Sequence, residues 1–203
     1  MEQLALHHYW PIANQNMVAK ILSEFAYEQA FQFEETEHGY QIKLENDTRY
    51  GFNGEKNIWG QIVIEPTSIQ RKSTVASNQP LSAALLMRDL QPLLNMPDEA
   101  FAEHLEDLNA TLLGDCKLMQ RKQTMTAGDL AMLPCEQQQS YFDGHPKFAF
   151  NKGRRGWGSD DLNLYAPEAQ RAFKLGWLAV HHSILQLATN DNVNWQHLVQ
   201  ACM

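Results

Sequence analysis

Apolar residues near the N-terminus recur at helical spacing. Between residues 11 and 29 they fall close to one face of a 3.6-residue period, and Pro11 suits the first turn of a helix. The apolar positions are Ile12, Val18, Ile21, Leu22 and Phe25. The pattern predicts a helix over residues 11–29 whose apolar face lies in the core.

The apolar spacing then changes from helical to alternating. From residue 31 to residue 64, apolar side chains recur at every second position, and turn residues such as Gly39 and Asn53-Gly54 separate the runs. The alternating positions are Phe31, Phe33, Tyr40, Ile42, Leu44, Tyr50, Phe52, Ile58, Ile62 and Ile64. They predict an antiparallel β-meander with one buried face.

Helical spacing returns after a polar, turn-rich stretch at residues 68–80. We expect helices over residues 80–94, 98–125 and 167–189, and a short helix between Leu130 and Tyr141. The apolar stripes are Phe101, Leu105, Leu108 and Leu112 in the second of these helices, and Phe173, Trp177, Val180 and Ile184 in the last.

This order of elements predicts the fold class. Residues 1–70 form a helix plus an antiparallel meander, and residues 80–203 form a helical part, so we expect an α+β fold with a segregated antiparallel sheet packed with helices. One contiguous core is expected to contain Phe31, Phe33, Ile42, Leu44, Ile62, Ile64, Leu105, Leu108 and Leu112.

Composition narrows the location and the class of ligand. The chain has 44% apolar residues but no apolar run of 18 or more, and the start MEQLALHHYW resembles neither a signal peptide nor a membrane span. We therefore expect a cytoplasmic protein with no membrane partner. The three cysteines lack CxxC spacing, and the histidine pairs are adjacent in sequence, which predicts free thiols and no metal site.

Positive charge is concentrated in one segment of an acidic chain. The formal net charge is −8, which argues against nucleic-acid binding, yet Lys147, Lys152, Arg154 and Arg155 lie within nine residues. They belong to GHPKFAFNKGRRGWG, residues 144–158, called the basic loop below.

The basic loop is rich in glycine and has neither helical nor strand spacing. Glycines permit close backbone approach, and Lys and Arg donate hydrogen bonds to phosphate or carboxylate, so the loop suits a polyanion such as a triphosphate. It is neither a Walker A loop nor a GxGxxG turn. A solvated surface loop, the contact surface of an interaction or dimerisation module, and an RNA-binding surface remain alternatives.

The exact string adds a resemblance to a known family. With the Tyr-Ala-Pro-Glu that follows, it resembles the N-terminal signature of the NRPS-independent siderophore synthetases, especially the aerobactin-synthase-like branch. The matching positions are Gly144, His145, Pro146, Lys152, Arg154, Gly156, Tyr165, Pro167 and Glu168. Many family members repeat His-Pro after the first pair, whereas this chain has Phe148-Ala149, so a role that needs a second imidazole is not carried over.

The resemblance implies an activity and its small-molecule partners. Such enzymes use ATP and Mg²⁺ to adenylate a carboxylate of citrate or of a citryl monoamide, and then pass the acyl group to an amine or a hydroxylamine, which yields an amide or a hydroxamate. The family is about three times as long as this chain and places its later nucleotide and magnesium motifs beyond residue 203. We therefore expect the N-terminal portion of a homodimeric synthetase, inactive by itself.

The resemblance also implies ligand-contacting residues within the basic loop. His145, Lys152 and Arg154 are the candidates for ATP phosphate contacts, with Lys152 and Arg154 facing the same way and Arg155 facing elsewhere. Supporting positions are Gly144, Lys147, Arg155 and Gly156. No residue is assigned a catalytic role. As loop cations, Lys152 and Arg154 are expected to contribute only about 0–1 kcal/mol to stability.

Two further groups of loop neighbours have expected roles. Glu136 and Glu168 are placed to orient the cations, and Asp160 and Asp161 are expected to be loop or cap residues and not magnesium ligands. Of the aromatic residues, Phe148, Phe150 and Trp157 are expected to pin the loop to the core more readily than to stack on adenine.

Overall fold

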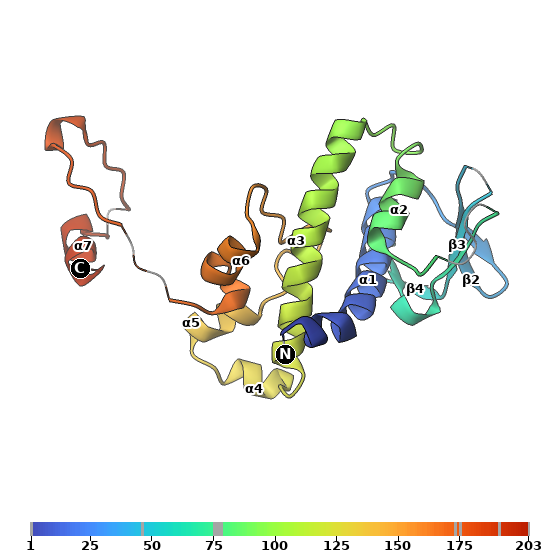
Figure 1. Ribbon diagram of the computed structural model, residues 1–203, viewed down its shortest axis with the longest axis horizontal. Coiled ribbons are helices and arrows are strands. Elements are labelled where there is room, and N and C mark those ends of the chain that lie inside the picture. Colours follow the sequence, from blue (N-terminus) through green and yellow to red (C-terminus); the bar gives the residue numbers. More distant parts are fainter. Residues whose placement is uncertain are drawn as a thin grey trace. The chain divides into compact units, whose positions relative to one another are not determined.

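The computed structural model describes residues 2–45, 47–74, 79–172, 174, 176–190 and 192–202. The chain divides into two units, Met1–Arg171 and Ala172–Met203. The first unit is an α+β structure, as the sequence predicted (Figure 1).

The first unit consists of one long helix, a run of six short strands and a second run of helices. Its helices are α1 (Glu2–Tyr27), α2 (Ala83–Leu90), α3 (Asp98–Lys122), α4 (Ala127–Ala131), α5 (Cys135–Gln138) and α6 (Ser159–Tyr165). Its 3₁₀ turns are η1 (Pro66–Ser68), η2 (Gln139–Tyr141) and η3 (Pro167–Ala169). Its strands are β1 (Glu34–Thr36), β2 (Gly39–Lys43), β3 (Arg49–Phe52), β4 (Gly54–Lys56), β5 (Ile62–Ile64) and β6 (Gln70–Lys72).

The strands form an antiparallel sheet of order β1-β2-β3-β6 and a separate β4-β5 hairpin. The predicted meander is confirmed, with three corrections. Phe31 and Phe33, expected in a strand, lie before β1 and have no strand structure. Strand β6 lies inside the stretch expected to be a linker, because Arg71 pairs with Tyr50 in the sheet and its Nε donates to Asp89 on α2 at 2.7 Å. Ile58, expected in a strand, lies in the hairpin turn and is exposed.

Helix α1 is longer than expected and contains Pro11 in its interior. Proline removes one helical hydrogen bond. Tyr9 and Trp10, just before it, are partly buried against the core, and Asn14 Nδ2 donates to the Trp10 carbonyl at 3.0 Å. These contacts favour helix on both sides of the proline.

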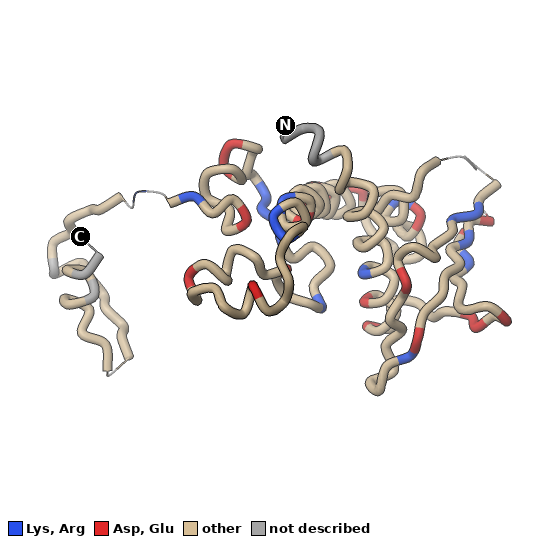
Figure 2. Tube along the Cα trace, turned by 90° about the horizontal axis from the view of Figure 1, so that it is seen from below, with Lys and Arg blue, Asp and Glu red and all other residues tan. Residues whose placement is uncertain are grey.

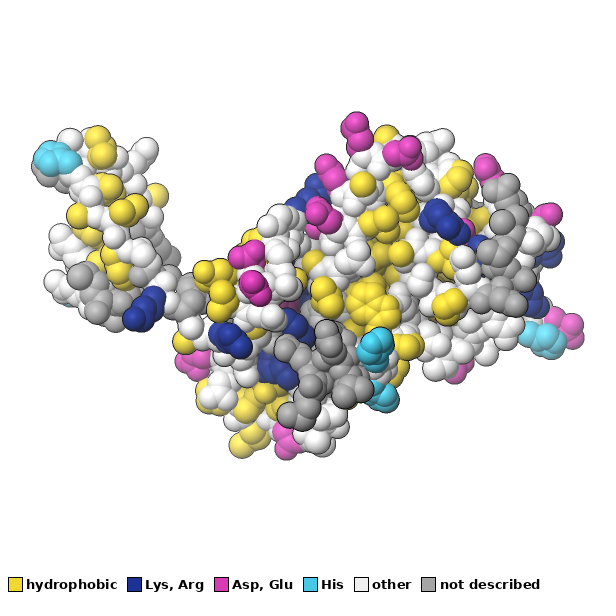
Figure 3. Space-filling model, in the orientation of Figure 1, with side chains coloured by type: hydrophobic (Ala, Val, Ile, Leu, Met, Phe, Trp, Pro, Cys, Tyr) yellow, Lys and Arg dark blue, Asp and Glu magenta, His cyan; other side chains and the backbone are white. Residues whose placement is uncertain are grey.

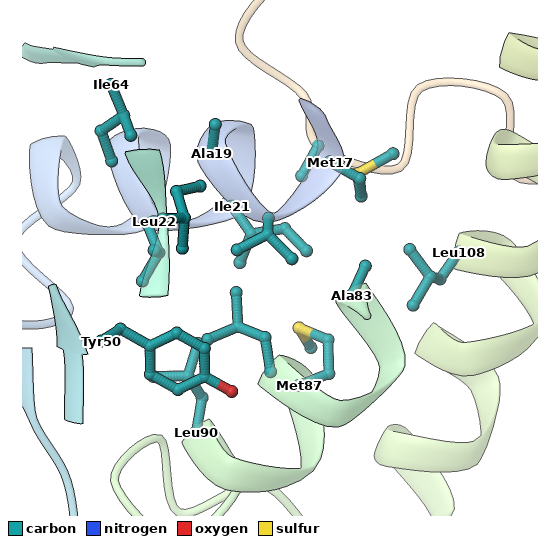
Figure 4. Packing of buried hydrophobic residues seen from close by; sticks show 14 of the residues in the cluster. Met17, Ala19, Ile21, Leu22, Tyr50, Ile64, Ala83, Met87, Leu90 and Leu108 are labelled. Atoms are coloured by element: carbon teal, nitrogen blue, oxygen red, sulfur yellow. The ribbon is translucent and has the colours of Figure 1, made fainter. Parts of the chain in front are cut away.

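The core lies between the sheet, α1, α2 and α3. Figure 4 shows Ile21 and Leu22 of α1 facing Met87 and Leu90 of α2, with the Tyr50 ring of β3 beside them. All nine residues expected in the core are there, either buried or partly buried against it. Period-two and period-3.6 stripes thus face each other, as they must to exclude water.

The helices after the meander agree with the sequence unevenly. Helix α3 is confirmed almost to its ends, whereas α2 is shorter than the expected range 80–94. The expected short helix before Tyr141 is present as α5 and η2. No helix among the described residues is long and apolar enough to cross a membrane.

The prediction of a helix over residues 167–189 is wrong. Its first residues form η3, the described residues 170–181 have no regular structure, and η4 (His182–Ile184) and α7 (Trp195–Cys202) follow in the second unit. The expected stripe residues Trp177, Val180 and Ile184 are exposed, and Phe173 lies outside the described residues. Most helical stability comes from packing of an apolar face, and within the described structure this stripe has none.

Candidate functional site

The basic loop lies between η2 and α6 and packs against α3 (Figure 1). Figure 2 shows basic positions gathered beside α3, and Figure 3 shows Lys and Arg side chains around the C-terminal end of this helix. The last turn of α3 itself carries Arg121 and Lys122, so the basic side chains at this end of the helix do not come from the loop alone.

Two loop glycines have a backbone conformation that other residues rarely adopt, with φ of 82° at Gly144 and 78° at Gly156. Gly153 is needed for another reason: a Cβ there would lie 2.5 Å from Asp107 Oδ1 on α3. The glycines thus allow the tight turns that the sequence predicted, and Gly153 also allows a close approach to α3 that it did not predict.

Lys152 is buried against α3. Its ammonium is 2.6 Å from Asp115 Oδ1 and also donates to the Asp143 carbonyl at 2.8 Å and to Asn151 Oδ1 at 3.4 Å. A lysine ammonium has three donors, and these three acceptors match them. Lys152 thereby fastens both the start and the middle of the loop to the helix.

The contact requires a notch in α3 at Gly114. A Cβ at this position would lie 2.7 Å from Lys152 Cδ, so the lysine stem crosses the helix where a side chain is absent. The backbone N–H of Lys152 donates to Thr111 Oγ1 at 3.2 Å, one turn earlier on α3. Burial raises the pKa of Asp115, and the hydrogen bond from Lys152 opposes that rise.

Arg154 turns toward η3 instead. Its Nη2 donates to both carboxylate oxygens of Glu168 at 2.9 Å, and the Glu168 side chain is 5% exposed. Glu168 therefore orients a loop cation, as expected. The expectation that Lys152 and Arg154 face the same way is wrong, because each is drawn to a different acid on a different element.

Arg155 and Lys147 lie nearer the solvent. Arg155 pairs with Asp107 at 3.0 Å and with Glu103 at 2.7 Å on α3. It therefore faces another element than Arg154, as expected. The Lys147 ammonium lies 3.6 Å from the ring centroid of Tyr27 at the end of α1. Both cations tie the loop to neighbouring helices at the surface.

His145 presents its imidazole to solvent. Its Nδ1 accepts a hydrogen bond from the Lys147 N–H at 3.3 Å, so in the neutral ring the proton is on Nε2, which is available to donate to a ligand. Its carbonyl accepts from Asn151 Nδ2 at 3.0 Å and from Lys20 Nζ at 3.4 Å. The backbone is held while the ring stays accessible.

The aromatic residues divide between the core and the surface. Phe150 is buried, with its ring centroid 5.6 Å from that of His104 on α3, so it pins the loop as expected. Phe148 and Trp157 are exposed, and Trp157 meets Tyr165 edge to face. Asp161 accepts from the Gly158 N–H at 3.0 Å and caps α6, as predicted.

The sequence analysis missed the partners of the loop on α3, namely Asp107, Thr111, Gly114 and Asp115. One signal was present, because a glycine inside a helical pattern often marks a close approach of another segment. Within the described residues, no group of three or more His, Cys, Asp or Glu is placed to hold a metal ion. The Mg²⁺ expectation stays a prediction.

Comparison with known proteins identifies the family. Residues 133–203, which contain the whole basic loop, match the model of the IucA / IucC family. An aerobactin synthase from Vibrio mimicus is 77% identical over 171 residues, which cover 84% of this chain. The chain belongs to the IucA / IucC family. The expected resemblance to an N-terminal portion is likewise confirmed.

More distant IucA / IucC relatives agree with this assignment. The aerobactin synthase of Escherichia coli is 38% identical over 97% of the chain. The solved structure of an aerobactin synthetase from Klebsiella pneumoniae superposes with a TM-score of 0.86 at 39% identity over 96% of the chain. A petrobactin biosynthesis protein from Bacillus anthracis, at 18% identity and a TM-score of 0.63, shares the fold.

The chain spans only part of these relatives. It covers 29% of the Vibrio mimicus protein, 33% of the Escherichia coli protein and 35% of the Klebsiella pneumoniae chain. The activity of a protein as long as these relatives is therefore a proposal for this chain.

Proposed function

We propose that this chain is the N-terminal portion of an ATP-dependent siderophore synthetase of the aerobactin-synthase type. The observation that carries the proposal is the 77% identity to an aerobactin synthase, together with an intact basic loop that is firmly held on α3. The complete enzyme would be cytoplasmic and homodimeric and would use ATP with Mg²⁺.

The proposed reaction has two steps. A carboxylate oxygen of citrate or of a citryl monoamide attacks the α-phosphorus of ATP, the bond to the bridging oxygen breaks, and pyrophosphate leaves. The amine or hydroxylamine then attacks the acyl carbon and AMP departs. Negative charge grows on phosphate oxygens in the first step, so donors fixed in advance around them lower the barrier.

The contacts of the loop support different roles for the three candidate residues. His145 would contact phosphate through Nε2–H, since its ring is exposed and its Nδ1 is already engaged. Arg154 uses three of its five donors on Glu168 and the Lys152 carbonyl, which leaves two for a ligand. Lys152, whose donors are matched within the fold, would position the loop.

The test uses the full-length protein that carries this sequence. We expect His145→Ala to lower citrate-dependent pyrophosphate release by about 10²–10³-fold, the usual cost of losing one donor to a developing oxyanion. His38→Ala is the matched control, because His38 is an exposed histidine in the turn before β2. Full activity in His145→Ala would remove this donor from the reaction and favour the alternative, a non-catalytic interaction or dimerisation module.

A further inference from the structure

A pocket of about 260 Å³ lies between α1, α3 and the inner side of the basic loop. Helix α1 contributes Asn16, Met17 and Lys20, helix α3 contributes Asp115, Leu118, Met119 and Lys122, and the segment around the loop contributes Asp143, Asn151 and Lys152. The pocket thus brings three lysines together in a chain whose formal net charge is −8.

Two of these lysines are already neutralised by the two aspartates. Lys152 pairs with Asp115 at 2.6 Å, and Lys122 pairs with Asp143 at 2.8 Å. The Asp143 side chain is 79% exposed, so most of it faces solvent. The unbalanced charge of the pocket is therefore that of Lys20.

The Lys20 ammonium uses little of its hydrogen-bonding capacity within the described structure. Within the described part of the chain, the hydrogen bond of its ammonium goes to the His145 carbonyl at 3.4 Å, which leaves two donors. Glu24, one turn along α1, is held toward the β4-β5 hairpin because its Oε1 accepts from Gln61 at 2.8 Å. Partial burial lowers the pKa of Lys20, and the Asp115 carboxylate opposes that shift.

We propose that this pocket binds one small oxyanion, the carboxylate or phosphate group of a reactant, and that Lys20 is the residue that contacts it. The inference rests on the proposed function for the choice of ligand, although the place of the site comes from the pocket itself. Because pockets for drug-sized ligands measure about 300–1,000 Å³, this smaller pocket suits a single small group.

The location also connects the pocket to the accessible face of the loop. Lys20 contacts the carbonyl of His145, whose ring faces solvent, so an oxyanion on Lys20 would lie directly behind the His-Pro turn. Lys152 closes one wall of the same pocket and holds the Asp143 carbonyl. A reactant group bound there would therefore stand close to the residues proposed to meet phosphate.

The experiment is a calorimetric titration of the 203-residue chain at low ionic strength, with citrate and inorganic phosphate as separate probes. We expect saturable one-to-one binding of at least one probe. Lys20→Met should weaken it by about 10–100-fold, the usual range for losing a hydrogen bond to a charged group. Lys20→Arg should retain most of the affinity. The probe that binds more tightly identifies the group as carboxylate or phosphate.

The matched control is Lys43→Met, which removes an exposed lysine paired with Glu34 on the sheet. Its affinity should equal that of the wild type. Melting curves accompany each variant, and Lys20→Gln replaces Lys20→Met if the methionine variant melts early.

Three results would overturn the inference. These are no binding of either probe, equal binding by the Lys20 variants, or an equal loss in Lys43→Met that reflects net charge alone. Turnover is not measured in these titrations, so their failure is separate from failure of the His145 test.

Discussion

Two neighbouring arginines of the basic loop meet very different surroundings. Arg154 forms a two-point contact with a carboxylate that is 5% exposed, while the Arg155 side chain is half exposed and pairs with acids on the surface of α3. A buried ion pair contributes little net stability when formed, but removing one partner leaves the other buried and uncompensated. Burial, not charge, decides how much each arginine matters to folding.

The first prediction follows from this contrast. Arg154→Ala should lower the free energy of unfolding by about 3 kcal/mol, near the lower end of the cost of breaking a buried pair, because Glu168 loses its partner. Arg155→Ala is the matched control and should change it little. Urea unfolding of both variants measures the difference, and equal stabilities would show that the Glu168 contact does not persist in solution.

This prediction corrects the expectation that the loop cations contribute only about 0–1 kcal/mol. Charge, glycine content and position pointed to a loop for anions with Glu168 as an orienting partner, but they could not reveal that Asp115 lies beneath the loop. Those partners are 37 and 14 positions away from Lys152 and Arg154, and only the packing of α3 and η3 brings them together.

Helix α3 is the element that supports the loop. It contributes an ion-pair partner at Asp115, a hydroxyl acceptor at Thr111 and an empty position at Gly114. A glycine inside a helix costs about 1 kcal/mol relative to alanine, so its presence here needs the compensating contact with Lys152.

The second prediction tests that notch. Gly114→Ala should destabilise the protein, because overpacking against the buried Lys152 stem costs about 1–3 kcal/mol and outweighs the gain in helix propensity. Gly128→Ala in α4 is the control, since its Cβ would lie at an ordinary 3.6 Å from Thr126 Oγ1. Thermal melts should shift in opposite directions, and a stabilised Gly114→Ala protein would contradict the packing described.

The sequence predicted helices and strands correctly wherever the apolar residues of the element are buried in the core. The long apolar period of α3 and the alternation around Ile42 predicted real elements. It misled at residues 167–189, where the stripe through Trp177 and Val180 is equally regular but exposed. Periodicity reports that a segment can be amphipathic, and a helix also needs a surface to pack on.

At the scale of the whole molecule, the buried apolar residues described in the first unit belong to one cluster. The core residues range from Ala13 to Phe150, and the unit that contains them ends at Arg171. The sheet and the helices therefore share one set of buried contacts, although the polar stretch at residues 68–80 separates them in sequence.

The third prediction concerns this division of the chain. A protein ending at Arg171 retains every core residue, so its melting temperature should stay within about 2–4 °C of the 203-residue chain, equivalent to about 1 kcal/mol. A control ending at Gln139 loses Phe150 and Lys152 and should melt much earlier. A large drop on removal of residues 172–203 would show that they stabilise the first unit.

The hydrogen bond from Lys152 to the Asp143 carbonyl sets the length of the basic loop. The two residues are nine positions apart in the sequence, and their hydrogen bond closes the turn between them. The ion pair with Asp115 holds the same ammonium on α3. An insertion or deletion between Asp143 and Lys152 should therefore weaken this hydrogen bond or the contact of the lysine stem with Gly114, and so loosen the loop. The exposed hairpin turn at Ile58 and Trp59 is held by short-range bonds, since Asn57 Oδ1 accepts from the Trp59 and Gln61 N–H groups at 3.0 Å, so an insertion there should disturb the turn and leave the core in place.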